Sequence, residues 1–170
     1  PGKRTMLKVK HVRTADVVVA GWRPYKNPGP DGEAIVGALL LGLFDEDGRL
    51  HNVGAAGAFS REARISLAQE LAAIEMGPDD PHPWRWHTEA GQRVPGMQSR
   101  WSGKKDMAFR ALQPILVAEV KYDHMQGDRF RHVASFMRWR PDRDPSSCTY
   151  EQLDKPVRFD VASVLAGEVR

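Results

Sequence analysis

Two pairs of basic residues in this chain have the spacing that places both side chains on one face of a β-strand. Lys8 and Lys10 flank a valine, and Arg138 and Arg140 flank a tryptophan. Strand side chains alternate between faces, so each pair points one way. Adjacent cations repel each other unless they face water or share an anion. Two interpretations are therefore open: a solvated edge strand, where lysine discourages further pairing, or a face that binds phosphate oxygens.

Basic residues are concentrated in two segments of a chain whose formal net charge is only +3. Residues 1–15 contain lysines and arginines and no acid, and a second basic run, RFRHVASFMRWRPDR, covers residues 129–143. In that run Asp142 stands between arginines and could orient one of them, although an ordinary turn after Pro141 explains the same residues. Two basic clusters on a nearly neutral body predict a polyanionic partner.

Several classes of protein and site are not indicated. Cys148 is the single cysteine, which rules out an internal disulfide and fits a reducing compartment. We find no apolar run of the roughly 18 residues that a membrane span needs, and no signal peptide, so we expect a cytoplasmic protein. Nucleotide-binding glycine motifs, a nucleophile elbow and metal-ligand spacings are absent from the sequence. We therefore expect no complete catalytic centre and no metal site in this chain.

The remaining pattern is that of a mainly β protein. Strands are predicted at 16–23, 35–45, 50–57, 114–122 and 132–140. Asp47-Gly48 predicts a hairpin turn, and the glycines of residues 50–57 predict a bend or bulge. A helix is predicted from Ser60, as N-cap, to the Gly77-Pro78 stop.

This order of elements predicts an OB-fold, a five-stranded antiparallel Greek-key barrel with one helix and a long loop insertion. Residues 78–110 form the irregular insertion, whose tryptophans either stack on bases or, for at least two of the chain's loop tryptophans, pin the loop to the barrel. We expect residues 1–15 to end a preceding domain, residues 16–145 to form the OB-fold domain and residues 146–170 to form a C-terminal tail.

The two basic segments also resemble known motifs. PGKRTMLKVKHVRTAD, residues 1–16, resembles motif V of the covalent nucleotidyltransferases, and RFRHVASFMRWRPDRDP, residues 129–145, resembles their motif VI. The segments 37–60 and 116–132 resemble the body of the OB domain of bacterial ATP-dependent DNA ligases, closest to the small C-type enzymes. The resemblance covers nearly the whole chain.

The resemblance implies a role for each basic position. Lys8 and Lys10 match the motif V lysines that contact the α-phosphate of ATP or AMP and support adenylyl transfer, and Arg4 matches an arginine in the approach to that motif. The motif VI positions are expected to orient the β- and γ-phosphates of ATP, and so the pyrophosphate leaving group. They are matched here by Arg131, Arg138, Arg140, Asp142 and Arg143.

The resemblance also limits what this chain can do. The nucleophilic lysine of the family lies in K-x-D-G, which is absent here; in GKKDM, Asp106 is followed by methionine. We therefore expect the C-terminal domain of a larger ATP-dependent ligase, with an upstream adenylation domain and Mg²⁺ in the parent enzyme. The parent would seal nicked double-stranded DNA through lysyl-AMP and AMP-DNA in DNA repair and recombination.

Two alternatives stay open at this point. One is a non-catalytic OB-fold module that binds nucleic acid, for which the lysine pair is only a phosphate grip. The other is the OB domain of an mRNA-capping guanylyltransferase, which shares both motifs. The ligase-like segment 37–60 argues against the capping enzyme.

Overall fold

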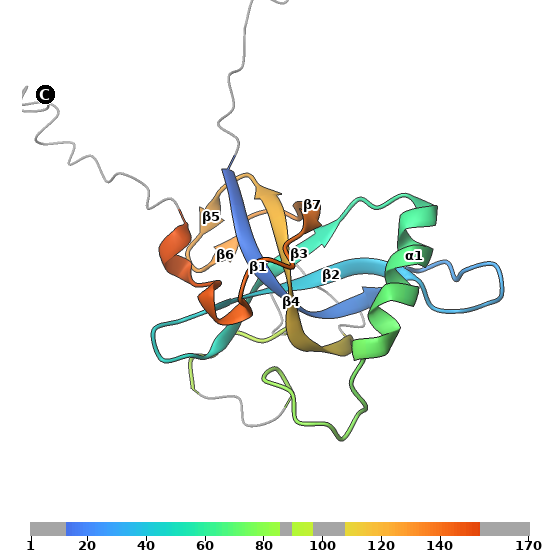
Figure 1. Ribbon diagram of the computed structural model, residues 1–170, viewed down its shortest axis with the longest axis horizontal. Helices are drawn as coiled ribbons and strands as arrows, with labels where there is room; N and C mark the ends of the chain where they lie inside the picture. The colour runs from blue at the N-terminus through green and yellow to red at the C-terminus, as the bar shows by residue number, and fades with distance from the viewer. Residues whose placement is uncertain (1–12, 86–89, 97–107, 154–170) are drawn as a thin grey trace, which may run out of the picture.

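Five strands close into a barrel in the order β1-β2-β3-β7-β4 (Figure 1). The barrel strands are Arg13–Pro24 (β1), Val36–Phe44 (β2), Leu50–Gly57 (β3), Arg110–Tyr122 (β4) and Ala134–Trp139 (β7). A separate two-stranded sheet pairs Met125–Gln126 (β5) with Arg129–Phe130 (β6). The computed structural model describes residues 13–85, 90–96 and 108–153. The barrel is mainly β and consistent with the predicted OB-fold.

One junction of the barrel corrects the prediction of a wholly antiparallel sheet. β3 and β7 run parallel, with Ala56 opposite Ala134 and Gly57 opposite Ser135, whereas the other neighbouring strands are antiparallel. An odd number of strands cannot alternate in direction all the way round a closed ring. A closed five-stranded barrel must therefore contain a parallel junction, and the sequence prediction overlooked this constraint.

The turn and the bulge between β2 and β3 are where the sequence placed them. Gly48 has φ of 77° and its N–H donates to the Asp45 carbonyl at 3.1 Å, which confirms the hairpin turn. The β2–β3 register then shifts at Leu41 and Gly42, opposite Gly54 and Asn52. Gly54 adopts φ of 149°, a region that favours glycine.

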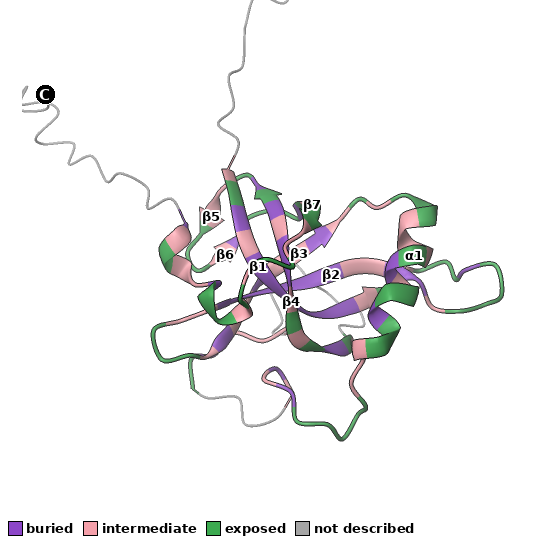
Figure 2. Ribbon diagram, viewed as in Figure 1, coloured by how far each residue is buried: buried purple, intermediate pink, exposed green. Residues whose placement is uncertain are grey.

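The core lies inside the barrel and under the single α-helix. Figure 2 shows the barrel strands buried along their inner faces, and the run Val17–Ala20 of β1 is fully buried. Helix α1, Arg61–Leu71, begins at the predicted N-cap, because the Ser60 hydroxyl accepts a hydrogen bond from the Ala63 N–H at 3.2 Å. The helix packs Leu71 against the core, and a 3₁₀ turn, Ala72–Ile74, continues it.

Strand β4 starts earlier than the sequence predicted, because Pro114 lies inside it. Val19 pairs with Leu116, but Gly21 pairs with Ala111, so the strand bulges between those positions. Proline has no N–H to give to a ladder and is tolerated at such a bulge. The four residues before Pro114 therefore belong to the strand that we expected to begin there.

Two segments outside the strands pack onto the barrel. The indole of Trp84 is buried and donates to the Leu50 carbonyl at 2.9 Å, so this tryptophan pins the insertion, as one interpretation predicted. Trp86 and Trp101 lie outside the described residues. After β7, the 3₁₀ turns Pro145–Ser147 and Tyr150–Gln152 place a buried Cys148 whose carbonyl accepts from Phe44 N–H at 2.8 Å. The division into 1–15, 16–145 and 146–170 stays a prediction.

No helix within the described ranges is long and apolar enough to cross a membrane.

Candidate phosphate-binding site

Arg140 lies at the centre of the basic segment that follows β7. Its Nη1 donates to both carboxylate oxygens of Asp16, at 3.0 and 3.1 Å. Its Nε and Nη2 donate to the two oxygens of Asp142, each at 2.9 Å, in a two-pronged contact. Two carboxylates from segments more than a hundred residues apart thus fix one guanidinium in place.

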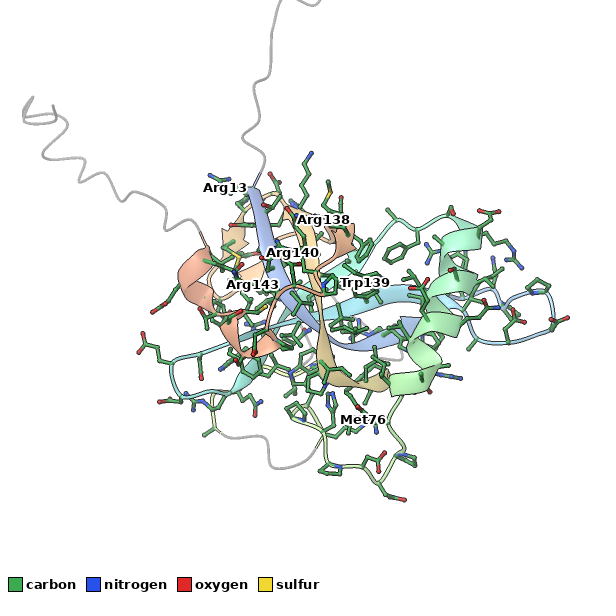
Figure 3. All side chains as sticks on the ribbon, in the orientation of Figure 1. Arg13, Met76, Arg138, Trp139, Arg140 and Arg143 are labelled. Carbon is green, nitrogen blue, oxygen red and sulfur yellow. The ribbon has the colours of Figure 1, made fainter. Side chains whose placement is uncertain are left out.

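The backbone fixes the same arginine from behind. Its N–H donates to the Val117 carbonyl of β4 at 2.8 Å, and its carbonyl accepts from the Arg143 N–H at 3.1 Å. The residues 140–143 therefore form a tight turn at the end of β7, directly beside β1 and β4. Figure 3 shows Arg138, Arg140 and Arg143 following one another across these strands.

The neighbouring strands supply the acids that balance the arginines. Asp16 of β1 and Glu119 of β4 are paired directly across the sheet, where like charges repel. Arg138 relieves this repulsion, since its Nε donates to Glu119 at 2.6 Å, while Arg140 binds Asp16. The register of three strands thus places acids and bases in alternation.

Arg143 is the least satisfied cation of the group. Its Nε is 3.7 Å from an Asp16 carboxylate oxygen, which is an ion-pair distance but too long for a hydrogen bond. That Nε is buried and has no hydrogen-bond partner among the described residues. A buried donor without a partner is unusual in a native structure, and an anionic ligand would satisfy it.

The ion pairs hold the acid–base group in its charged form. The hydrogen bond from Arg140 lowers the pKa of Asp142 to about 2. The hydrogen bond to Asp142 and the charges of Asp16, Asp142 and Glu119 raise the pKa of Arg140, against the opposing effect of burial. The group is therefore fully ionised at neutral pH.

Arg131, which the resemblance also assigned to motif VI, lies apart from this group. Its Nη1 contacts the imidazole of His124 at 2.9 Å, and its N–H donates to the His124 carbonyl. Asp123 lies 3.4 Å from both His124 and His132 and completes this separate cluster. The structure thus brings together Arg138, Arg140, Asp142 and Arg143 but not Arg131.

Three predicted residues cannot be placed. Arg4, Lys8 and Lys10 lie outside the described residues, so their assignment to the nucleotide site stays a prediction.

Sequence reasoning missed the two acids of the group, Asp16 and Glu119. A signal for both was present: each is a single acidic residue next to a run of β-branched and apolar residues in a predicted strand. A charged residue in such a strand needs a partner of opposite sign. Only the strand register shows that the partners are the motif VI arginines.

Metal ligands are not gathered in the described part of the chain: no group of three or more histidine, cysteine, aspartate or glutamate side chains there could hold a metal ion. The described residues therefore do not fit the Mg²⁺ that the resemblance implies for the parent enzyme.

Comparisons with known proteins agree with the arrangement of this site. Residues 32–143 match the family described as the ATP dependent DNA ligase C terminal region. DNA ligase C of Mycobacterium tuberculosis is 49% identical over 98% of this chain and 46% of the relative, and DNA ligase C2 of Mycolicibacterium smegmatis is 51% identical over 92% of this chain and 44% of the relative. The chain thus spans less than half the length of these relatives.

Solved ligase structures have the same fold. The ligase domain of M. tuberculosis LigD superposes with a TM-score of 0.57 at 29% identity, covering 82% of this chain and 39% of that chain. A mycobacterial DNA ligase D complexed with ATP and MES superposes with a TM-score of 0.55 at 28% identity, covering 82% and 38%. The family match covers more than half of the chain, and the paired basic residues of motif VI lie together as that family requires. This chain therefore belongs to the family of C-terminal regions of bacterial ATP-dependent DNA ligases.

Proposed function

We propose that the protein carrying this chain seals nicks in double-stranded DNA in three steps, through lysyl-AMP and AMP-DNA. In this proposal the chain closes over ATP in the first step and contacts DNA afterwards, as part of DNA repair. The nucleophilic lysine and the Mg²⁺ ligands belong to an adenylation domain of the same polypeptide. ATP supplies the adenylyl group.

The observation that carries this proposal is the buried, unpartnered Nε of Arg143 beside the fixed guanidinium of Arg140. Arg140 already donates most of its N–H groups to Asp16 and Asp142, so its main effect is to fix the turn. Arg143 and the half-exposed Arg138 then present forks to the β- and γ-phosphates. Preorganised cations of this kind orient the leaving group without reorganisation during the reaction.

Lys8 and Lys10 are proposed to act at the α-phosphate, where negative charge develops during adenylyl transfer. Arg4 is proposed to support them, and Arg131 to contact the nucleotide phosphates from the neighbouring cluster. Exchanging Lys8 or Lys10 for alanine removes a cation aimed at the reacting phosphorus. We expect a loss of roughly 100-fold in the rate of enzyme adenylylation.

The test is ATP-dependent sealing of a nicked duplex by the full-length protein, with adenylylation followed separately by transfer of labelled AMP from ATP. Sealing that needs ATP, with Lys8→Ala and Lys10→Ala both slow in AMP transfer, supports the proposal. Binding of DNA without AMP transfer or sealing contradicts it and favours the non-catalytic OB-fold module. AMP transfer replaced by GMP transfer, with no sealing, favours the capping enzyme instead.

A further inference from the structure

A second group of arginines surrounds a hollow of about 200 Å³ on the barrel. Arg23, Arg93 and Arg129 line it, together with Asn52, Gly54 and Phe130. None of these arginines belongs to the motif VI group. Among the described residues that line the hollow, none is acidic.

The three arginines come from segments far apart in the sequence. Arg23 lies near the end of β1, opposite Ala38 of β2, and Arg129 opens the short strand β6 opposite Gln126. Arg93 lies in the insertion after Trp84. Only the closed barrel brings these three segments to one place.

The insertion is held against β3 at the position of Arg93. The Arg93 carbonyl accepts from the Asn52 N–H at 2.8 Å, and the Arg93 N–H donates to Nδ1 of His51 at 3.2 Å. Asp128 then fixes the guanidinium, with an Nη2–Oδ1 distance of 3.0 Å. Arg93 is thus positioned by its own backbone as well as by its side chain.

The floor of the hollow is rigid because it is built on the β3 bulge. The Asn52 side chain bridges the bulge, donating to the Leu41 carbonyl at 3.0 Å and the Gly54 carbonyl at 3.2 Å. A Cβ at Gly54 would lie 3.2 Å from the Phe130 ring, so glycine allows the ring to lie close against β3. Phe130 in turn stacks on Tyr122 with ring centroids 4.8 Å apart.

The charge balance of the hollow favours an anion. Three guanidinium groups line it, and the nearest acid in the printed contacts, Asp128, pairs with Arg93 and is half exposed. Arginine forks match the oxygens of a phosphate. The hollow is large enough for a phosphate group but small for a nucleoside with its phosphates.

The aromatic floor favours a phosphodiester backbone over a base. Phe130 is only 5% exposed and is covered by its stack on Tyr122, so it offers no open face on which a base could lie. Contacts from three separate segments suit an extended chain of phosphates better than one enclosed nucleotide. Such contacts position a duplex without reading its sequence.

We propose that Arg23, Arg93 and Arg129 form a binding site for backbone phosphates of the duplex DNA on which the enzyme acts. This inference rests on the proposed function, because it takes DNA as the substrate. It separates two phosphate sites in one small domain: the motif VI group for the phosphates of ATP, and the arginine hollow for those of DNA.

The test is a fluorescence-anisotropy titration of a labelled nicked duplex with the full-length protein, at several salt concentrations. Arg23→Gln, Arg93→Gln and Arg129→Gln are compared with Arg61→Gln, which removes the same charge from the exposed start of α1. Each hollow variant should weaken binding roughly fivefold to tenfold at about 0.1 M salt and reduce the slope of log K against log salt by about 0.9. Arg61→Gln should change neither quantity.

Two further measurements keep the result interpretable. Arg129→Lys keeps the charge and so should keep the salt slope while losing part of the affinity that the fork provides. Thermal unfolding of each variant shows whether the fold is retained. Tripolyphosphate at millimolar concentration should compete equally weakly with wild type and with the hollow variants, because it is not the proposed ligand.

The outcomes separate this inference from the proposed function. Hollow variants that bind DNA like Arg61→Gln, in a protein that seals nicks, overturn the inference and leave the ligase function intact. Variants that change competition by tripolyphosphate but not DNA affinity assign the hollow to free nucleotide phosphates and also overturn it. Absence of AMP transfer and sealing overturns the proposed function, whatever the DNA titration gives.

Discussion

The two groups of arginines in this domain differ in how their charge is balanced. In the motif VI group, Arg138 and Arg140 each bind a carboxylate in a strand or turn next to them. In the arginine hollow, Arg93 alone has a printed carboxylate partner, Asp128 at the rim. One group is held by its own acids, and the other leaves most of its positive charge facing the hollow.

This difference is informative about what each group can do. A guanidinium clamped by two carboxylates has a fixed direction but little free charge, which suits the orientation of a single leaving group. Arginines around a hollow without acids present net charge, which suits attraction of a polyanion. The following experiments are designed to break or sharpen this distinction, beginning with the largest expected effect.

Arg140→Ala should have the largest effect. It removes the guanidinium that fixes the turn at 140–143, so the rate of enzyme adenylylation should fall roughly 100-fold. Sealing of a nick that already carries AMP should change by less than about threefold, because the β- and γ-phosphates have left. Single-turnover assays of the two steps check this. An equal loss in both steps would contradict the role given to motif VI and remove the distinction between the two groups.

Gly54→Ala should have the next largest effect, this time on the floor of the hollow. The new Cβ would meet Phe130 at 3.2 Å in a backbone region that disfavours alanine. We expect the free energy of unfolding to fall by about 2 kcal/mol, with weaker DNA binding. Gly32→Ala is the control, since it has φ of 82° but no atom within 4 Å. Urea unfolding measures both; an equal loss would show that backbone strain, not contact with Phe130, is responsible.

Asp16→Asn should lower the adenylylation rate roughly tenfold. Asp16 is only 14% exposed and binds Arg140 and Arg143, so the amide would weaken the positioning of both arginines. Asp142→Asn is the matched control and should cost about threefold or less, because that carboxylate is 63% exposed. Arg140→Ala combined with Asp16→Asn should be little worse than Arg140→Ala alone. Additive losses would show that Asp16 acts other than through Arg140.

Asp128→Asn should slightly strengthen DNA binding. It removes the acid at the rim while Arg93 keeps its backbone contacts to β3, so affinity for a nicked duplex should rise about twofold to threefold. Glu151→Gln, an exposed acid outside the hollow, should leave affinity unchanged. Anisotropy at low salt measures both. A loss of affinity on Asp128→Asn would mean that the ion pair, rather than the free charge, makes the hollow functional.

The smallest effect is expected from pH. The folded pKa of Asp142 is about 2 and its model value is 3.8, so the ion pair with Arg140 stabilises the fold above about pH 4. That contribution is lost only as the pH falls through about 2. Carbon-13 NMR of the carboxylates should show Asp142 still ionised at pH 3, and titrating near 3.8 in Arg140→Ala. An unshifted Asp142 in the wild type would show that the clamp is absent in solution.

Much of the barrel could be predicted from local patterns. Asp47-Gly48 fixed the hairpin, Ser60 fixed the start of α1, and β-branched runs located β1 and β2. The β4 start was missed because Pro114 resembles a boundary but lies in a bulge. The parallel β3–β7 junction was missed because it follows from closure of the whole ring, which is not a local property.

The sequence by itself determined which residues are chemically available: alternating cations in two basic segments, an acid between arginines, and one thiol. These are set by residue type and by the two-residue period of a strand. The tertiary structure decided which of them meet. Asp16 reaches Arg140, and Arg23, Arg93 and Arg129 share one hollow, because strand register and barrel closure join positions about a hundred residues apart. Such long-range pairing depends on the packing of the whole domain, and no local pattern contains it.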